Sequence, residues 1–495
     1  MLRHLSITCA ACLLLCIDVA GLLAEVPLNG ASRPNVLFIA IDDLRPALGC
    51  YGDRLAKSPN LDHFAKNARQ FNRAYVQQAV CGPSRTALLT GLLPDHTQAW
   101  HNRNRFRDTL PEHVTLPQLF KQNGYRTLSF GKVFSGNERE LDPISWSEPE
   151  VLRRTGWKNY LLPHNQGKGK KQAAYEVADV AEAAYPDGKL ADLAVKTLEN
   201  LKQGGGPFFL AVGFFKPHLP FNAPRKYWDL YDGAAFELPD ELRDPVKLSP
   251  EIALHSHREL GGYKRVPNDE DLDVNQSRIL RHGYYACVSY VDAQVGKVLD
   301  ALERLGLGQN TIVVIWGDHG FALGETNRWC KGTNFELDTR VPLLIRTPNL
   351  AHPGVAADAL VEMVDLYPSL AALAGLEMPA GLDGRSLVPI VHDPLARGRD
   401  VVFSQFNRPW SSATPEVMGY SIRTKIARYN RWIDWQSRET IAEELYHYSG
   451  AKNATRHAGH VIERRNIAAN QSGLLERMSD QMDDMLALRR QGARE

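Results

Sequence analysis

The sequence predicts an α/β fold in which a large, mainly parallel β-sheet lies between helices and a smaller antiparallel sheet follows it. Three observations lead to this prediction. Apolar runs of strand length alternate along the chain with segments of helical periodicity. These runs are nearly continuous, which is typical of parallel strands buried on both faces. Beyond residue 393 the pattern changes to short alternating segments with aromatic residues.

The elements of the main sheet follow in chain order. Residues 35–41 (NVLFIAI) predict the first buried strand. A helix is expected over residues 81–90, because Pro83 suits a first helical turn and Gly91 can close the last turn. The same criteria predict helix 115–124, strand 126–134, helix 189–202, strand 207–215, helix 284–306, strand 311–318 and strand 341–348.

Two long polar stretches, residues 136–188 and 232–276, interrupt this order. Stretches of this kind in a compact domain are usually functional loops or insertions at the rim of a site. A small antiparallel sheet with a closing helix is expected from segments 401–406, 420–429 and 431–436 and from the charged tail. We therefore expect a main domain over residues 25–393 and a C-terminal subdomain over residues 394–495.

The N-terminus has the pattern of a secretory signal peptide. Residues 1–24 combine a short basic start, an apolar stretch and the small residue Ala24. The apolar stretch is short for a spanning helix, although an uncleaved membrane anchor is the alternative. A lipoprotein signal at Cys16 is a weaker alternative, because Leu15 is a poor small residue before it. We expect an exported chain, periplasmic or secreted, without a stable membrane span after cleavage.

Charge and cysteine content narrow the classes of function. The 58 basic residues nearly balance the 57 acidic ones, so no nucleic-acid partner is expected from the total charge. After cleavage four scattered cysteines remain, which do not make a disulfide framework: Cys50, Cys81, Cys287 and Cys330. An exported chain needs a reason to keep unpaired thiols, and for Cys81 we expect chemical modification.

The stretch VCGPSRTALLTG, residues 80–91, places Cys81 at the start of a predicted helix. Free backbone N–H groups and the helix dipole favour a bound anion there. Arg85 lies on the same face one turn later and can hold two oxygens of that anion. The stretch therefore predicts a nucleophile beside an anion-binding site. The alternative is that Cys81 is only a small buried hydrophobic residue.

Polar residues follow four of the predicted strands: Asp42, Asp43, Lys132, Lys216, His218, Asp318 and His319. Open α/β sheets bind ligands beyond the carboxyl ends of their strands, so these residues are expected to form one site. The adjacent carboxylates of Asp42 and Asp43 repel each other unless a cation or hydrogen bonds compensate. With Asp318 they offer oxygen ligands to a divalent cation, and the His319 imidazole leaves calcium, zinc and manganese open. The structural alternatives are turns or caps for the aspartates, a satisfied histidine and, in WCKGTNFE, a solvated Lys331.

Together these segments resemble the type I, formylglycine-dependent sulfatases. CGPSRTALLTG matches the family signature Cys-x-Pro-Ser-Arg followed by Leu-Thr-Gly. The Asp-Asp pair, GYRTLSFGK, GDHG and ELYHY occur in the family's order, and the resemblance covers essentially the whole mature chain. Within the family, GKVF, FFKPHLPF and WCKGTNFE look closest to the iduronate-2-sulfatase group and its bacterial relatives.

The resemblance implies an alkaline-phosphatase-like fold, a catalytic domain over residues 25–393 and hydrolysis of sulfate esters on a sugar or polysaccharide. It also implies that a separate maturation enzyme oxidises Cys81 to formylglycine (3-oxoalanine), whose hydrate attacks sulfur. One Ca²⁺ per chain would be held by Asp42, Asp43, Asp318, His319 and the formylglycine oxygen at Cys81. The residues that would bind the sulfate or assist the leaving group are Arg85, Lys132, His218 and Lys331.

One position departs from the pattern. Where the iduronate-2-sulfatase group has a histidine after GKVF, this chain has Ser135, which cannot replace an imidazole as a base near neutral pH. His101, in a nearby loop, is one candidate to supply a base instead. Two alternative functions stay open from the sequence: hydrolysis of phosphoryl or phosphonyl esters on the same scaffold, and carbohydrate binding without catalysis. The substrate itself cannot be predicted from the fold.

Overall fold

The computed structural model describes residues 33–492, apart from 136–140, 152–157, 168–171, 255–258, 268–270, 411, 451–453 and 458. The predicted signal peptide, residues 1–24, lies outside the described residues. No helix within the described ranges is long and apolar enough to span a membrane.

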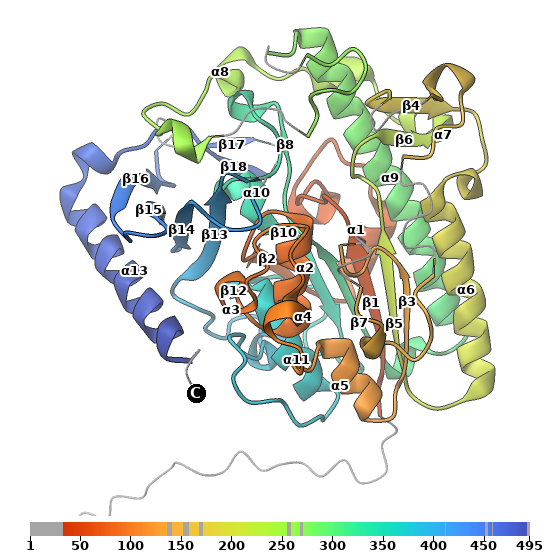
Figure 1. The fold of residues 1–495 in the computed structure, drawn as a ribbon. Coiled ribbons are helices and arrows are strands. Elements are labelled where there is room, and N and C mark those ends of the chain that lie inside the picture. Colours follow the sequence, from red (N-terminus) through yellow and green to blue (C-terminus); the bar gives the residue numbers. More distant parts are fainter. Residues whose placement is uncertain are drawn as a thin grey trace, which may run out of the picture. The chain divides into compact units, whose positions relative to one another are not determined.

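The described residues contain a central sheet of eight strands, ordered β10-β2-β11-β7-β1-β5-β3, with β12 paired to β2 (Figure 1). Their bounds are β1 Asn35–Ile41, β2 Arg69–Tyr75, β3 Arg126–Gly131, β5 Phe208–Phe214, β7 Thr311–Gly317, β10 Arg340–Val341, β11 Leu343–Arg346 and β12 Ala357–Glu362. Strands β7, β1, β5 and β3 are consecutive and parallel. Their carboxyl ends therefore meet at one edge, as the sequence predicts for a mainly parallel sheet.

Three strands of the central sheet differ from the prediction, and two of them, β2 and β12, have no counterpart among the predicted strands. The predicted strand 341–348 contains β11, which runs antiparallel to both β7 and β2. Strand β2 is not predicted because its sequence RQFNRAY has neither a continuous apolar run nor strict alternation of polar and apolar residues. Pairing with β10, β11 and β12 nevertheless makes β2 part of the sheet.

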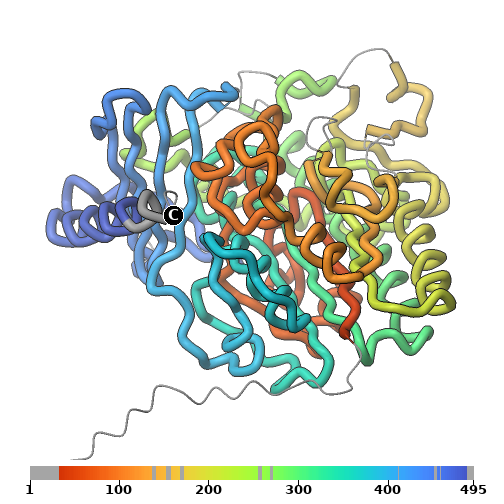
Figure 2. The backbone as a smooth tube through the Cα atoms, turned by 60° about the horizontal axis from the view of Figure 1, so that its bottom comes forward, coloured from red at the N-terminus to blue at the C-terminus, as the bar shows by residue number. Residues whose placement is uncertain are grey.

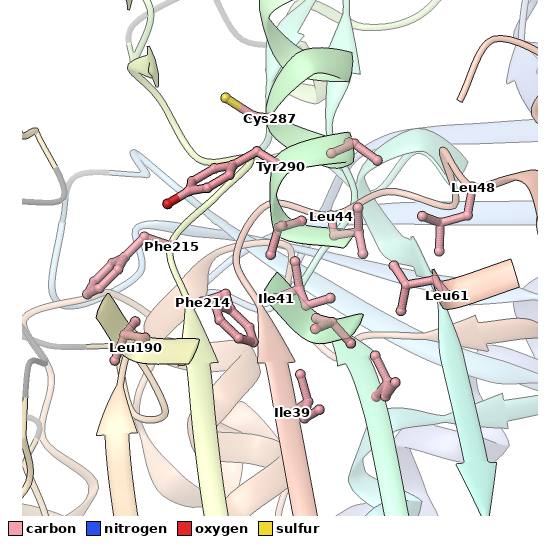
Figure 3. Packing of buried hydrophobic residues seen from close by; sticks show 14 of the residues in the cluster. Ile39, Ile41, Leu44, Leu48, Leu61, Leu190, Phe214, Phe215, Cys287 and Tyr290 are labelled. Carbon is pink, nitrogen blue, oxygen red and sulfur yellow. The ribbon is translucent and has the colours of Figure 1, made fainter. Parts of the chain in front are cut away.

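Alternate residues of β1 enter two different hydrophobic cores. Ile39 and Ile41 face helices α1 (Pro59–Ala65), α6 (Pro186–Gly204) and α9 (Val274–Arg304) (Figure 3). Phe38 faces the opposite core, which includes Leu88 and Phe120 of helices α2 (Cys81–Thr90) and α5 (Leu116–Gln122). A strand buried on both faces needs apolar residues at every position, which explains the continuous run in the sequence.

Helix α9 is fixed at its start and along its length by carboxylates. Asp273 and Gln276 form a capping box at its N-terminus. Further along, the Asp292 carboxylate accepts hydrogen bonds from the backbone N–H groups of Asn60 and Leu61 at 3.2 and 2.8 Å. Asp292 thereby satisfies free N–H groups in the first turn of α1 and joins the two helices.

The C-terminal part contains the predicted antiparallel sheet. Its strands are β13 Val402–Arg408, β14 Val417–Arg423, β15 Ala427–Asp434 and β16 Thr440–His447, and helix α13 (Ser472–Gly492) packs on it. Segment 420–429 spans two of these strands and the turn between them. The blue C-terminal segment lies beside the orange segment around α2 in both views (Figures 1 and 2). The division into domains 25–393 and 394–495 stays a prediction.

The remaining described α-helices and β-strands are short. They are α3 Pro94–Thr97, α4 Phe106–Thr109, α7 Arg225–Trp228, α8 Asp240–Arg243, α10 Glu336–Thr339, α11 Leu366–Leu373, α12 Val388–His392, β4 Tyr175–Ala178, β6 Phe221–Pro224, β8 Ala322–Leu323, β9 Trp329–Cys330, β17 Ala454–His457 and β18 His460–Glu463.

Candidate active site

Cys81 is the first residue of α2, where the sequence predicts it. Every residue of this helix is buried, and Gly91 closes it with φ = 70°, in the left-handed region that favours glycine. The Asn102 side chain accepts a hydrogen bond from the backbone N–H of Gly82 at 2.7 Å, and the Ser84 hydroxyl donates to the Asp318 carbonyl. The helix start is thereby fixed against the loop around residue 102 and against the end of β7.

Three buried carboxylates meet at the carboxyl ends of β1 and β7. Asp42 and Asp43 follow β1, and Asp318 follows β7, the neighbouring parallel strand. The backbone N–H of Asp43 donates to Asp318 Oδ1 at 2.9 Å. Three such charges repel one another strongly in a buried site unless cations balance them.

Arg85 and Lys132 provide part of that balance. Arg85 Nε lies 2.8 Å from Asp318 Oδ2, and its Nη2 lies 3.2 Å from Asp42 Oδ1. Lys132 Nζ lies 2.6 Å from Asp42 Oδ2. Although burial opposes ionisation, the charge of Arg85, reinforced by that of Lys132, holds the pKa of Asp318 well below its usual range. Arg85, expected to hold an anion, here fixes two carboxylates.

His319 presents one ring nitrogen to the carboxylates. Its Nδ1 lies 3.0 Å from the Gly320 carbonyl, which can only accept, so Nδ1 carries the proton. The lone pair of Nε2 then faces Asp43 Oδ1, at 3.3 Å, and Cys81 Sγ, also at 3.3 Å. A backbone carbonyl that fixes the tautomer in this way is the usual partner of a metal-binding histidine.

The Cys81 sulfur lies inside the same cluster. Sγ is 3.2 Å from Lys132 Nζ and 3.5 Å from Asp42 Oδ1. Burial, reinforced by the charge of Asp42, raises the pKa of the Cys81 thiol well above its usual range. An unmodified Cys81 is therefore a neutral thiol, which is a poor nucleophile and a poor metal ligand.

The cluster has the donor set of a divalent-cation site. Ligand atoms of Asp42, Cys81, Asp318 and His319 all lie within 4.8 Å of one another, and Asp43 contacts the same imidazole. Buried carboxylate oxygens with one imidazole suit a hard or borderline divalent cation. The residues predicted as metal ligands are thus together in the structure, and they fit such an ion chemically.

On the other side of Asp43 lie Lys331, His218 and a glutamate that the sequence did not indicate. Lys331 Nζ is 2.8 Å from Asp43 Oδ1 and 3.0 Å from Glu259 Oε2. Glu259 Oε1 is 3.1 Å from His218 Nε2, while His218 Nδ1 is 2.6 Å from the Leu219 carbonyl. About a quarter of the Glu259 side chain is exposed (26%), so this group lies at the opening of the cluster.

Lys216 does not join the cluster, although it follows β5 in the sequence. Its buried ammonium donates to the carbonyls of His218, at 2.9 Å, and Pro220, at 2.5 Å. The Asp187 carboxylate accepts from the backbone N–H groups of Phe215 and Lys216 at 2.9 and 2.8 Å. Lys216 and Asp187 therefore shape the loop that carries His218.

Comparison with known proteins decides the family. A family model described as "Sulfatase" matches residues 34–376, well over half of the chain. The chain belongs to the sulfatase family. A second model, "N-sulphoglucosamine sulphohydrolase, C-terminal", matches residues 324–439 of this sulfatase. This chain is 35% identical over 476 residues to iduronate 2-sulfatase of Homo sapiens, covering 82% of this chain and 86% of the relative. It is a sulfuric ester hydrolase, as the resemblance implies.

Solved structures confirm the predicted alkaline-phosphatase-like fold. A protein in complex with its substrate D-glucosamine-2-N,6-O-disulfate superposes with a TM-score of 0.73 at 23% identity, covering 93% of this sulfatase and 98% of that chain. A phosphonate monoester hydrolase of Agrobacterium radiobacter gives a TM-score of 0.74 at 21% identity, covering 92% and 96%. Identities this low show the fold and leave the substrate of this sulfatase open.

Ser135 stands where the iduronate-2-sulfatase group has a histidine, and His101 is the candidate to supply a base in its place. Ser135 is partly buried two residues after Val133, whose carbonyl accepts from Arg85 at 3.0 Å. His101 Nδ1 accepts the backbone N–H of Arg103 at 3.1 Å, so a neutral His101 carries its proton on Nε2. Burial and the charge of Arg103 lower the pKa of His101. With its lone pair engaged, His101 is badly placed to act as a base.

Proposed function

We propose that this sulfatase hydrolyses sulfate esters of a sulfated saccharide, with residue 81 as formylglycine and with one bound Ca²⁺. The observation that carries the proposal is the position of Cys81 at the start of α2, in contact with Asp42, Lys132 and His319. Similarity to an iduronate 2-sulfatase supports a saccharide substrate. The neutral state of the thiol supports modification, because an unmodified Cys81 is unreactive there.

Asp42, Asp43, Asp318 and His319 would hold the cation together with the side-chain oxygen of the modified residue 81. Calcium prefers carboxylate oxygens, and three of these four residues are aspartates. The cation held by these residues would supply positive charge that polarises sulfate oxygens, and a hydrated formylglycine at position 81 would supply the attacking hydroxyl.

The fixed cations of the chain would stabilise the reacting sulfate group. Lys132 and Lys331 contact Asp42 and Asp43 on two sides of the cluster, and each brings an ammonium group to it. Preorganised charges of this kind stabilise negative charge that develops in a transition state without reorganisation of solvent. Arg85 acts indirectly, because it holds Asp42 and Asp318 in place.

His218 would protonate the oxygen of the departing saccharide. Its Nε2 lies 3.1 Å from the partly exposed Glu259 at the opening of the cluster, where a leaving group has access. An alkoxide leaves far more readily when a positioned acid protonates it, and such groups contribute roughly 10²–10⁴-fold to rates.

The proposal also includes the oxidation of Cys81 and the export of the chain. A maturation enzyme must oxidise Cys81, and residues 80–91 of this chain carry the Cys-x-Pro-Ser-Arg signature that such an enzyme is expected to recognise. Export is supported by the signal-peptide pattern of residues 1–24. We therefore place the mature sulfatase in the periplasm or outside the cell.

Peptide mass spectrometry of chain produced with and without the maturation enzyme tests the modification. An aldehyde or its hydrate at position 81 should accompany activity on sulfated mono- and disaccharides, and Cys81→Ser should remove that activity. Cys50→Ser, at another unpaired and partly exposed cysteine, is the matched control and should keep it. Full activity of chain with only unmodified Cys81 would refute the mechanism. Faster turnover of phosphonate monoesters than of any sulfate ester would favour the alternative substrate class.

A further inference from the structure

A cavity of about 600 Å³ lies away from the cluster around Cys81. It opens between the part of the central sheet that contains β2, β10 and β12 and the C-terminal part of the chain. Residues of these three strands, of β17 and β18 and of the turn after β14 line it. None of the residues described above as site residues lines it. Figure 1 shows β2, β10, β17 and β18 in neighbouring positions.

The cavity carries an excess of positive charge. Five cationic side chains line it, of which Arg423 pairs with Glu336. None of the other four lies within ion-pair distance of a carboxylate among the described residues: Arg73, Arg340, Lys425 and Arg456. Arg340 donates to the carbonyls of Asn72 and Gly459 at 2.8 and 3.3 Å, which orients its guanidinium without neutralising it. Lys425 and Arg456 are exposed at the rim.

The acidic residues of the cavity do not cancel this charge. Glu336 is buried and already pairs with Arg423 at 3.0 Å and with Arg428 at 2.9 Å. The charge of Glu336 is therefore balanced by these two arginines and does not offset the other cations of the cavity. Asp358 is the other acidic lining residue, and its carboxylate accepts from the Asn72 amide at 2.8 Å. One exposed carboxylate against four cations leaves a site that attracts anions.

The cavity also offers apolar surface. The ring of Tyr448 is half-buried and stacks on the Arg423 guanidinium, whose centre lies 3.8 Å from the ring centroid. Ile426 lies at the rim with 56% of its surface exposed. A ligand that suits this lining combines anionic groups with a partly apolar ring face.

We propose that this cavity is a second binding site for an anionic saccharide, remote from the reacting sulfate. The choice of a saccharide rests on the proposed function, because a sulfatase that acts on a sulfated polymer meets a ligand with many anionic groups. Sulfate and carboxylate groups of the ligand would contact Arg73, Lys425 and Arg456, and a sugar ring would lie near Tyr448 and Ile426. The site would retain the polymer while its chain end reacts elsewhere.

Calorimetric titration with a heparin hexasaccharide tests the proposal, using chain with unmodified Cys81 so that no turnover occurs. Lys425→Ala/Arg456→Ala removes two exposed cations from the cavity. Lys189→Ala/Lys202→Ala, two exposed lysines of α6, is the matched control. Lys331→Ala weakens binding at the candidate active site only. Aryl sulfate hydrolysis by each modified variant is measured in parallel.

The cavity variant should bind the hexasaccharide roughly tenfold more weakly than the control, with a smaller dependence on salt. It should keep the wild-type rate on the aryl sulfate, and Lys331→Ala should retain the cavity binding. Equal affinity of the cavity variant and the control would overturn the proposal. Inorganic sulfate that displaces the hexasaccharide from the cavity as well as unlabelled hexasaccharide does would show a site for free anions. Oligothymidylate that does the same would show a general polyanion site. Either result would also overturn the proposal. If the proposed function is wrong, the modified wild-type chain would not hydrolyse the aryl sulfate, while binding of the hexasaccharide at the cavity would be unchanged.

Discussion

Replacement of Glu259 by glutamine tests whether the charge of Glu259 positions His218 at the opening of the active site. The Glu259 carboxylate bridges His218 Nε2, at 3.1 Å, and Lys331 Nζ, at 3.0 Å. Although burial opposes ionisation, the charge of Lys331 holds the pKa of Glu259 well below its usual range. The carboxylate is therefore ionised at neutral pH and orients the group that would protonate the leaving saccharide. Glutamine keeps the shape and one acceptor, but it removes the charge.

The size of the effect follows from these two contacts. A hydrogen bond to a charged group contributes about 1.5–3 kcal/mol, against about 1 kcal/mol for a neutral one. Loss of the charge at Glu259 should thus weaken the positioning of His218 by roughly 1–2 kcal/mol, which corresponds to roughly 5- to 30-fold in rate. The loss should appear only where the leaving oxygen needs a proton. A saccharide alkoxide needs it, whereas an acidic phenol leaves without it.

The assay compares kcat on a sulfated saccharide with kcat on an aryl sulfate for Glu259→Gln. Glu251→Gln, an exposed glutamate of the same polar stretch, is the control and should match the wild type on both substrates. A selective loss on the saccharide supports the positioning role. An equal loss on both substrates would refute it, because that pattern arises from impaired sulfate binding through Lys331 or from misfolding.

The metal cluster, Ser135 and Asp292 provide three further tests. Asp318→Asn should reduce calcium affinity, measured by titration, and turnover together; undiminished turnover without metal contradicts the proposed site. With Ser135, rapid mixing with an aryl sulfate should show a burst of released phenol before slower turnover, and Ser135→His should shrink the burst and raise the steady rate by at least about tenfold. Burial raises the pKa of Asp292 to about 6. Because the folded chain then binds more protons than the unfolded chain between about pH 4 and pH 6, the free energy of unfolding should fall by roughly 3 kcal/mol as pH rises through that window. Asp292→Asn should lose this pH dependence in urea titrations, and an unchanged profile would show that another group causes it.

The sequence predicted the middle of the sheet because burial on both faces leaves a clear pattern. Strands β1, β5 and β7 are buried at every position, so their apolar runs are continuous. Strand β2 lacks such a run, and its buried Arg69 donates hydrogen bonds to backbone carbonyls, including that of Ala351 at 2.8 Å. A buried arginine with many acceptors is compatible with a central strand, yet it looks like a surface residue in the sequence.

The candidate site was predictable where its residues follow strands directly. Asp42, Lys132 and Asp318 follow β1, β3 and β7, whose carboxyl ends lie at one edge of the parallel run β7-β1-β5-β3, so the topology places them at the same edge. Glu259 could not be found in the same way. It lies in a long polar stretch, where a single glutamate has no pattern that separates it from its solvated neighbours. Asp187 left a weak signal, as an acidic residue beside a proline in the first turn of a helix.

Glu259 sets the charge balance of the site and thereby couples metal binding to substrate binding. Asp42, Asp43 and Asp318 balance the three cations Arg85, Lys132 and Lys331, so Glu259 leaves this group with one excess negative charge. A sulfate ester, itself an anion, would then enter against repulsion. A divalent cation reverses this balance, because its two positive charges compensate the excess negative charge and the charge of one sulfate monoester. Calcium and substrate should therefore bind with positive cooperativity, and Glu259→Gln should allow tighter binding of free sulfate in the absence of metal.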